Sequence, residues 1–368
     1  GEEAYVKVEY VIAISIVVAT FADAGLRNYV LYHFGRNRDA TQTTFLTSRA
    51  AVFVFAFQIV LLAGTIMASH ALLLPDTAAT GLWLGVLRGI ALSIVGVATQ
   101  IFIIHDRLLL GILLSLSFWV IGAIALVLPD GTPANIRVMV FFASAFLTLF
   151  AVPLLLCRTT GLKPTSVGFA YLQSATGWAW PLLLAAGTSM AAASIVRVYG
   201  ITAYSATVAA GLVFWMRIFS LIQLSHRAAV TIVSRSIFSS DDSDVLSPQV
   251  LRTYMLLVIP SIALAFIVGF AAPVLNTLFE WHLPLLSPLV ITMVGLQVTF
   301  WTLSSLLEMP LNRQGNVFSV LFASAASAVL FIGTFLTLHD PTPLILTSTM
   351  ALASMVQFAI LLLRNFSR

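Results

Sequence analysis

The sequence predicts an all-α membrane protein made of many transmembrane helices. Only 9% of the 368 residues are Asp, Glu, Lys or Arg, whereas about a quarter of the residues in soluble domains are charged. Apolar residues make up 60% of the chain, and the mean hydropathy is +1.03. A helix needs about 20 apolar residues to cross the hydrocarbon of a bilayer, where it satisfies its own backbone hydrogen bonds. The number of such stretches predicts a polytopic helical bundle.

Charged residues, Gly and Pro divide the chain into about eleven apolar stretches of bilayer length. Because the sequence begins Gly1-Glu2-Glu3 without a Met, we expect one further helix before it. The complete bundle would then have about twelve spans. The eleven expected spans are 6–25, 50–73, 81–104, 108–128, 136–156, 178–197, 204–225, 251–275, 285–307, 316–337 and 343–363.

A weak internal repeat divides these helices into two halves of six. The segment Phe21–Val30 closes the first span much as Leu224–Thr231 closes a later one, and an Arg-bearing amphipathic segment follows each. The basic stretch Cys157–Ser166 would join the halves, so we expect an N-terminal lobe over 1–160 and a C-terminal lobe over 161–368. Two similar halves are typical of secondary transporters.

The basic residues predict the orientation of the bundle. If residue 1 lies outside, thirteen of the 18 basic residues fall in cytoplasmic joints. Only Lys7, Arg137 and Arg197 fall in outer joints, and Arg88 and Arg217 fall within spans. Cytoplasmic loops carry an excess of Lys and Arg, so the carboxyl end is expected in the cytoplasm. The thirteen are Arg27, Arg36, Arg38, Arg49, Arg107, Arg158, Lys163, Arg227, Arg235, Arg252, Arg313, Arg364 and Arg368.

Several classes of function receive no support. The sequence pI is 9.5, but the basic residues are spread over the span ends and form no patch for nucleic acid. The single Cys157 excludes an internal disulfide and offers no cysteine cluster for a structural metal. The six His residues are scattered, and no phosphate-binding loop, dinucleotide fingerprint or catalytic dyad is present. We therefore expect a protein that is not an enzyme.

Three stretches resemble the MOP superfamily, and most of all its bacterial polysaccharide flippases of the Wzx type. Gly1–Tyr5, an apolar span and then Phe21–Asn28 resemble the family's outer loop, second helix and Asp-x-Gly-Leu turn. Trp180 to Phe219 resembles the opening helix pair of its second half, and Leu307–Asn316 the turn before its last two helices. Many relatives have an acidic-basic pair where this chain has Val196-Arg197, which puts any role of that acid in doubt.

The resemblance implies two six-helix lobes around a central cavity that opens alternately to either side of the membrane. It also implies a bacterial cytoplasmic (inner) membrane and an undecaprenyl-pyrophosphate-linked oligosaccharide as substrate. Partners besides the lipid bilayer would be the polysaccharide polymerase and the chain-length machinery, and no nucleic acid.

Two arginines within spans are the leading candidates for substrate binding. An Arg in a span costs a few kcal/mol on insertion scales, so it usually faces a cavity or a protein partner. Arg88 borders a row of small residues, Gly81, Gly85 and Gly89, whose spacing favours close helix packing. Arg217 sits near the middle of its span. Both are expected in a shared cavity that binds pyrophosphate or acidic sugar, although Arg88 could instead snorkel or cap a carbonyl.

Three more arginines are expected at the cytoplasmic mouth of the pathway. Arg27, Arg49 and Arg227 could capture a diphosphate through bidentate hydrogen bonds. Their alternative role is to fix the topology and to contact lipid head groups.

Two acids near the first span are candidates for coupling to H⁺ or Na⁺. Glu9 and Asp23 could titrate or coordinate a cation as the transporter turns over. Asp23 could equally form a local salt bridge with Arg27, four residues on. No cofactor and no resident metal are expected, because the acidic run Asp241–Asp244 lacks the Gly and Glu of a calcium loop.

Two alternative functions remain open. A MATE-like exporter of cationic drugs would need net negative charge in its cavity, whereas Arg88 and Arg217 favour an anionic substrate. A membrane glycosyltransferase or polymerase would need a sizeable outer loop, and the outer joints here are short.

Overall fold

A computed structural model describes most of the second half of the chain and part of the first. The described residues are 2–22, 58–61, 63–64, 67, 76–105, 107–127, 145, 148, 151–156, 158–159, 169–239, 246–279, 286–338 and 340–366.

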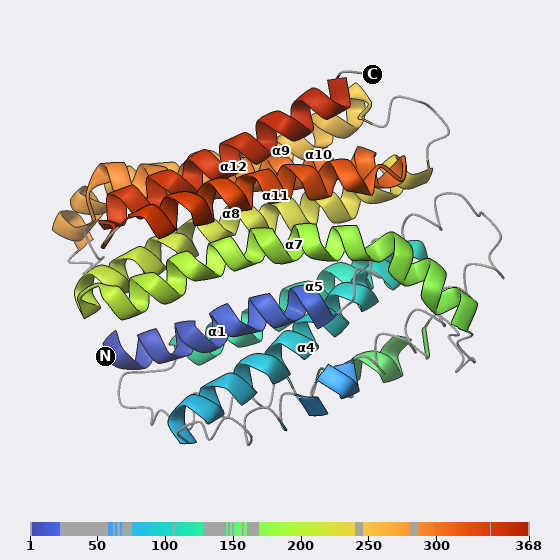
Figure 1. Cartoon of the computed structure of the whole chain (residues 1–368), viewed down its shortest axis with the longest axis horizontal. Coiled ribbons are helices and arrows are strands. Elements are labelled where there is room, and N and C mark those ends of the chain that lie inside the picture. The colour runs from blue at the N-terminus through green and yellow to red at the C-terminus, as the bar shows by residue number, and fades with distance from the viewer. Residues whose placement is uncertain are drawn as a thin grey trace. The chain divides into compact units, whose positions relative to one another are not determined.

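Nine long helices run through the described part of the chain, labelled as in Figure 1. The sequence predicted helices throughout, and the all-α fold class is confirmed. They are α1 (Glu2–Ala22), α4 (Asp76–Ile104), α5 (Leu108–Val127), α7 (Phe169–Ala203), α8 (Ala206–Ser239), α9 (Pro248–Phe279), α10 (Pro288–Arg313), α11 (Val317–Thr337) and α12 (Pro343–Phe366).

Seven of these helices are long and apolar enough to cross a membrane. They are α4 and α7 to α12, and the apolar span in α9 reaches a mean hydropathy of 2.5 over Pro248–Leu278. α1 and α5 contain shorter apolar stretches, Val11–Ala22 and Leu109–Phe118. The chain is therefore a multi-pass membrane protein. The expected spans 50–73 and 136–156 lie mostly outside the described residues, so the count of about eleven stays a prediction.

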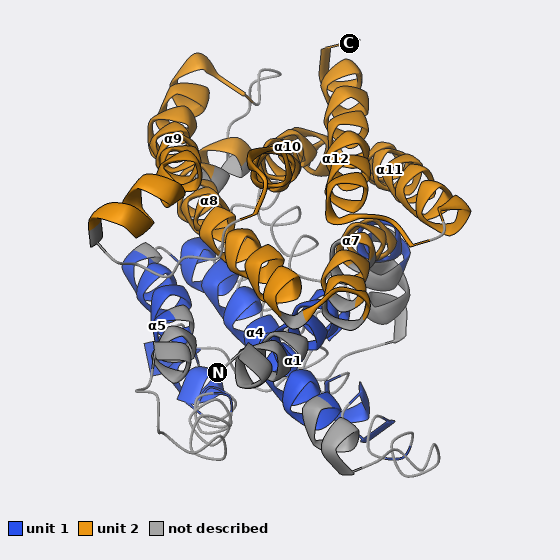
Figure 2. Cartoon of the chain, turned by 90° about the vertical axis from the view of Figure 1, so that its left-hand side faces the viewer, with its two compact units in different colours: residues 1, 3–183 blue, residues 2, 184–368 orange. Residues whose placement is uncertain are grey.

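The chain divides into two compact units, coloured separately in Figure 2. The N-terminal unit comprises residues 1 and 3–183, and the C-terminal unit comprises residues 2 and 184–368. The division falls inside α7, between Leu183 and Leu184. The boundary that the sequence suggested, between residues 160 and 161, lies outside the described residues and stays a prediction.

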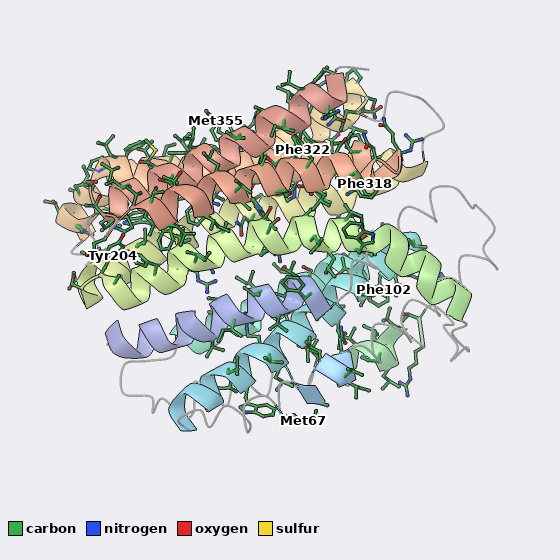
Figure 3. All side chains as sticks on the ribbon, viewed as in Figure 1. Met67, Phe102, Tyr204, Phe318, Phe322 and Met355 are labelled. Atoms are coloured by element: carbon green, nitrogen blue, oxygen red, sulfur yellow. The ribbon has the colours of Figure 1, made fainter. Side chains whose placement is uncertain are left out.

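In the N-terminal unit, α4 packs closely against α1. A Cβ atom added to Gly85 would lie 2.6 Å from Ile14, and one added to Gly89 would lie 2.6 Å from Val18. Such distances are too short for real side chains, so these two glycines let the helix backbones approach. The predicted small-residue row is confirmed at these two positions. The core continues along α4 to Phe102, which is fully buried (Figure 3).

In the C-terminal unit, aromatic side chains fill the space between α8, α9 and α10. Trp215 and Phe219 on α8 are fully buried, and Phe219 meets Phe266 of α9 edge-on, with ring centroids 5.1 Å apart. Gly295 on α10 leaves room for these rings, because a Cβ there would lie 2.5 Å from Phe266. α12 packs against α10 and α11. Phe318 and Phe322 of α11 and Met355 of α12 are exposed (Figure 3).

Several helices extend beyond the spans that the sequence suggested, among them α8 and α10. α8 continues from residue 225 to Ser239, because Ala229, Val233 and Ile237 repeat every four residues and are all buried. α10 continues to Arg313. The turn expected over Leu307–Asn316 is therefore confined to residues 314–316. Gly315, with a φ of 75°, reverses the chain there.

Candidate functional site

Arg88 lies in the interior of the N-terminal unit, where three helices meet. Its side chain is on α4 and only 3% exposed. Its Nη1 donates a hydrogen bond of 2.9 Å to the Ser15 hydroxyl of α1. Its guanidinium carbon lies 5.4 Å from the ring centroid of Phe118 on α5, within cation–π range. The arginine thus connects α1, α4 and α5.

The glycines of α4 explain how this arginine reaches its partner. Gly85 and Gly89 bring the backbone of α1 against α4, and Arg88 follows Gly85 by three residues. The Ser15 hydroxyl accepts from Arg88 and donates to the Ile12 carbonyl at 2.7 Å. The prediction that Arg88 faces protein and not lipid is confirmed. Its place in a substrate cavity stays a prediction.

A second buried polar contact lies in the same unit. The Gln58 amide nitrogen donates to the Ser93 hydroxyl at 3.0 Å and to the Ala22 carbonyl at 3.3 Å. Gln58 and Ser93 are 3% and 4% exposed. Sequence reasoning missed these residues and Ser15. Their only signal is that each is a single polar residue within a long apolar stretch.

Arg217 and Arg227 both lie on α8 and are half-buried. They are ten residues apart, so their Cα atoms are separated by roughly 15 Å along the helix. Between them, the buried His226 ring nitrogen Nδ1 and the Tyr254 hydroxyl of α9 are 2.6 Å apart. The two arginines therefore lie at different levels along α8, and their roles in substrate binding stay predictions.

The remaining predicted site residues are not described. Arg27, Arg49 and Asp23 lie outside the described residues. Glu9 belongs to α1, but its side chain lies outside the described part. Their roles in substrate capture and in ion coupling therefore stay predictions. No group of three His, Cys, Asp or Glu side chains that could hold a metal occurs within the described ranges.

The C-terminal unit contains a carboxylate that sequence reasoning had placed in a turn. Glu308 lies within α10, where its Oε1 accepts a hydrogen bond of 3.2 Å from the Gln357 amide of α12. The same amide nitrogen donates to the Ser324 hydroxyl of α11 at 3.2 Å. Gln357 and Ser324 are 3% and 1% exposed. This contact joins three membrane-spanning helices, and its sequence signal is an acid inside the apolar run 306–311.

One further contact ties together two turns of the C-terminal unit. The Tyr204 hydroxyl, between α7 and α8, donates to the Pro341 carbonyl between α11 and α12 at 2.6 Å. Tyr199 and Phe335 complete the cluster with edge-on ring contacts. Burial and, to a lesser degree, the neighbouring Tyr199 raise the pKa of Tyr204 to about 12. The phenol therefore stays protonated, and able to donate this bond, throughout the physiological pH range.

Comparison of the sequence with family models and with curated proteins gives no match. Comparison of the structure with solved structures gives several. The MATE multidrug transporter DinF-BH, solved as a complex, aligns with a TM-score of 0.67 and 12% identity, over 99% of this chain and 87% of that one. The Vibrio cholerae MATE transporter VcmN, in its bent form, aligns with a TM-score of 0.58 and 13% identity, over 100% and 87%.

A eukaryotic MATE transporter, AtDTX14, aligns at a TM-score of 0.53 and 13% identity, over 99% of this chain and 85% of that one. Sequence identities as low as these are evidence about the fold only. The predicted fold is confirmed, and membership of the MOP superfamily stays a prediction. Over essentially its whole length, the chain has the fold of the MATE transporters.

Proposed function

We propose that the protein is a MOP-fold transporter that flips an undecaprenyl-pyrophosphate-linked oligosaccharide from the inner to the outer leaflet by alternating access. The fold supports the transporter class, because the similar solved structures are transporters and not enzymes. The sign of the charge within the helices supports an anionic substrate. Arg88, Arg217 and Arg227 are cationic side chains at buried or half-buried positions on α4 and α8.

In this proposal the arginines bind the phosphates of the substrate. A guanidinium group offers planar, bidentate hydrogen bonds to phosphate oxygens. Arg217 and Arg88 would act within the pathway, and Arg27, Arg49 and Arg227 at its cytoplasmic mouth. Glu9 and Asp23 would couple the cycle to H⁺ or Na⁺. Residue 1 would face outside the bacterial inner membrane, next to the polymerase and chain-length machinery.

Substitution of Arg217 tests this function. Arg217→Gln removes the charge and the bidentate geometry, so export should fall at least about tenfold, the loss expected from one charge-assisted hydrogen bond. Arg217→Lys keeps the charge and should restore export only in part. The measurement is surface polysaccharide per transporter molecule in a deletion strain that carries each variant.

The matched control is Arg252→Gln, because Arg252 is an exposed arginine at the start of α9. This variant should export as the wild type does. Normal surface polysaccharide in the Arg217→Gln strain, at unchanged protein level, would remove Arg217 from the mechanism.

Export of cationic compounds is a second candidate function. The observation that favours it is the fold similarity to the MATE multidrug transporter DinF-BH. Extrusion of cationic dyes by the wild type, without any polysaccharide defect on deletion, would support this candidate against the flippase.

A further inference from the structure

Three helical segments meet at one end of the N-terminal unit. α4 and α5 lie side by side (Figure 1) and are joined by a short turn, in which the Arg107 amide donates to the Phe102 carbonyl at 2.7 Å. The third segment consists of residues 151–156 and 158–159. Its Leu156 belongs to the same buried cluster as Phe102. The turn and the third segment therefore both pack on α4.

Two buried clusters indicate the register of α5 against the third segment. Phe118 of α5 shares one cluster with Ala145, which precedes the third segment. Leu110 of α5 packs against the other cluster, which contains Val152 of the third segment. Because the residue numbers fall along α5 while they rise along its neighbour, the two run antiparallel. The start of α5 therefore lies level with the end of the third segment.

Two exposed arginines lie at this shared level. Arg107 directly precedes α5, and Arg158 lies at the end of the third segment. The register places them within about one helical turn, roughly 5 Å, of each other along the helix direction. Neither side chain has a hydrogen-bond or ion-pair partner among the described residues. Two guanidinium groups at one end of the unit can therefore bind a group from outside the protein.

The charge at this end of the unit favours an anion. The described side chains of the N-terminal unit include no acid. His105 lies beside the turn, and burial lowers its pKa, so its imidazole is neutral at pH 7 and adds no charge. A phosphate group complements the two arginines, because guanidinium groups offer it planar, bidentate hydrogen bonds.

The arginines lie where lipid head groups are found. The membrane-spanning stretch of α4 ends at Ile104, three residues before Arg107. From this level an apolar stripe on α5 runs into the bilayer for roughly 16 Å within an arc of about 60°, and one leaflet's hydrocarbon is about 15 Å deep. The α5 stripe consists of Leu109, Leu113, Leu116 and Val120, each at least 45% exposed.

The third segment has the same arrangement of an apolar residue and a cation. Leu154 is 55% exposed and precedes Arg158 by four residues, so both lie on one face of the helix. Exposed apolar residues of a membrane protein contact acyl chains of any lipid. Two arginines at the same level add a preference for a lipid whose head group carries a net negative charge.

We propose that this end of the N-terminal unit binds one anionic phospholipid. Its phosphate lies between Arg107 and Arg158, and its acyl chains lie along the α5 stripe. We call this place the Arg107–Arg158 lipid site. The basic residues of the sequence predict that this end is cytoplasmic, so the lipid belongs to the inner leaflet. A bound lipid would connect the α4–α5 turn to the third segment and stabilise the folded unit.

Thermal unfolding of the purified full chain in lipid nanodiscs tests the site. Discs of phosphatidylcholine are compared with discs in which phosphatidylglycerol replaces part of that lipid. The wild type should melt at least about 3 °C higher with phosphatidylglycerol, because a ligand of the folded state stabilises it. Inorganic phosphate added to phosphatidylcholine discs should give no such shift, since acyl chains supply part of the affinity. An equal shift with inorganic phosphate would identify a soluble anion and overturn the lipid site.

Substitutions of the two arginines test whether they share one head group. Arg107→Gln and Arg158→Gln should each remove most of the shift. The double variant should lose no more than either single variant, because both arginines act on the same ligand. The matched control is Arg252→Gln, which removes an exposed arginine of α9 and should keep the shift. Additive losses, or an equal loss in the control, would indicate a diffuse attraction to the anionic bilayer and overturn the site.

Native mass spectrometry of the detergent-purified protein measures the bound lipid directly. The wild type should retain phosphatidylglycerol, and Arg107→Gln should lower the retained fraction about tenfold. Arg107→Lys should give an intermediate fraction, because Lys keeps the charge without the bidentate geometry. Equal retention of phosphatidylcholine and phosphatidylglycerol by the wild type would overturn the preference for an anionic lipid. The lipid site does not rest on the proposed transport function, and no saccharide takes part in these measurements.

Discussion

Arg88 shows how one buried charge can be accommodated in a membrane-spanning bundle. Its guanidinium has a hydroxyl partner on α1 and an aromatic ring on α5, so it is neither in lipid nor at the membrane surface. The sequence could indicate that Arg88 faces protein, because the neighbouring glycines mark a close helix contact. It could not indicate Ser15, which lies 73 residues away on another helix.

Arg88→Gln should destabilise the protein. The substitution removes a hydrogen bond from a charged donor and the cation–π contact. Loss of both should lower the free energy of unfolding by about 2 kcal/mol or more. Thermal unfolding of the purified protein measures this. The exposed Arg252→Gln variant is the control and should melt with the wild type. An unchanged melting temperature for Arg88→Gln would show that Arg88 does not hold the three helices together.

At the scale of elements, apolar stretches between charges located most helices but not their ends. α11 and α12 begin within one residue of the predicted positions 316 and 343. α8 was predicted too short, because its amphipathic continuation past residue 225 looked like a separate surface segment. The pairing of Glu308 with Gln357 could not be predicted, since 49 residues separate them and no local periodicity encodes contacts between helices.

The α1–α4 contact makes a prediction about glycine. Gly89→Ala would place a Cβ 2.6 Å from Val18 and 2.7 Å from the Ser15 carbonyl, so it should lower the free energy of unfolding by about 1–3 kcal/mol. Gly333→Ala in α11 is the matched control, because nothing lies within 4 Å of its added Cβ. That variant should be stabilising by up to about 1 kcal/mol, since Ala favours helix. Thermal unfolding that ranks the two variants in the opposite order would contradict the packing of α1 against α4.

At the scale of the whole molecule, the sequence sufficed for the fold class because hydropathy alone specifies membrane-spanning helices. Loose motifs suggested the superfamily, and comparison with solved structures confirms the fold that those motifs imply. The identity of the substrate could not be predicted as firmly as the fold. It depends on side chains that come together from distant parts of the chain, and several of these lie outside the described residues.

The orientation of the molecule is the next prediction. A Cys introduced between residues 239 and 246, in a Cys157→Ser background, should not react with a membrane-impermeant maleimide in intact cells. It should react after the membrane is permeabilised, because the excess of basic residues in these joints predicts that they lie in the cytoplasm. A Cys introduced in the predicted outer joint between residues 130 and 137 is the control and should react in both conditions. Labelling of the 239–246 position from outside would reverse the topology.

The most direct test of the central claim is transport in a purified system. Proteoliposomes that contain the full chain and a labelled undecaprenyl-pyrophosphate oligosaccharide are compared with protein-free liposomes. We expect protein-dependent movement of the oligosaccharide across the bilayer, reduced at least about tenfold by Arg217→Gln. Movement of a cationic dye with no movement of the lipid-linked oligosaccharide would contradict the account.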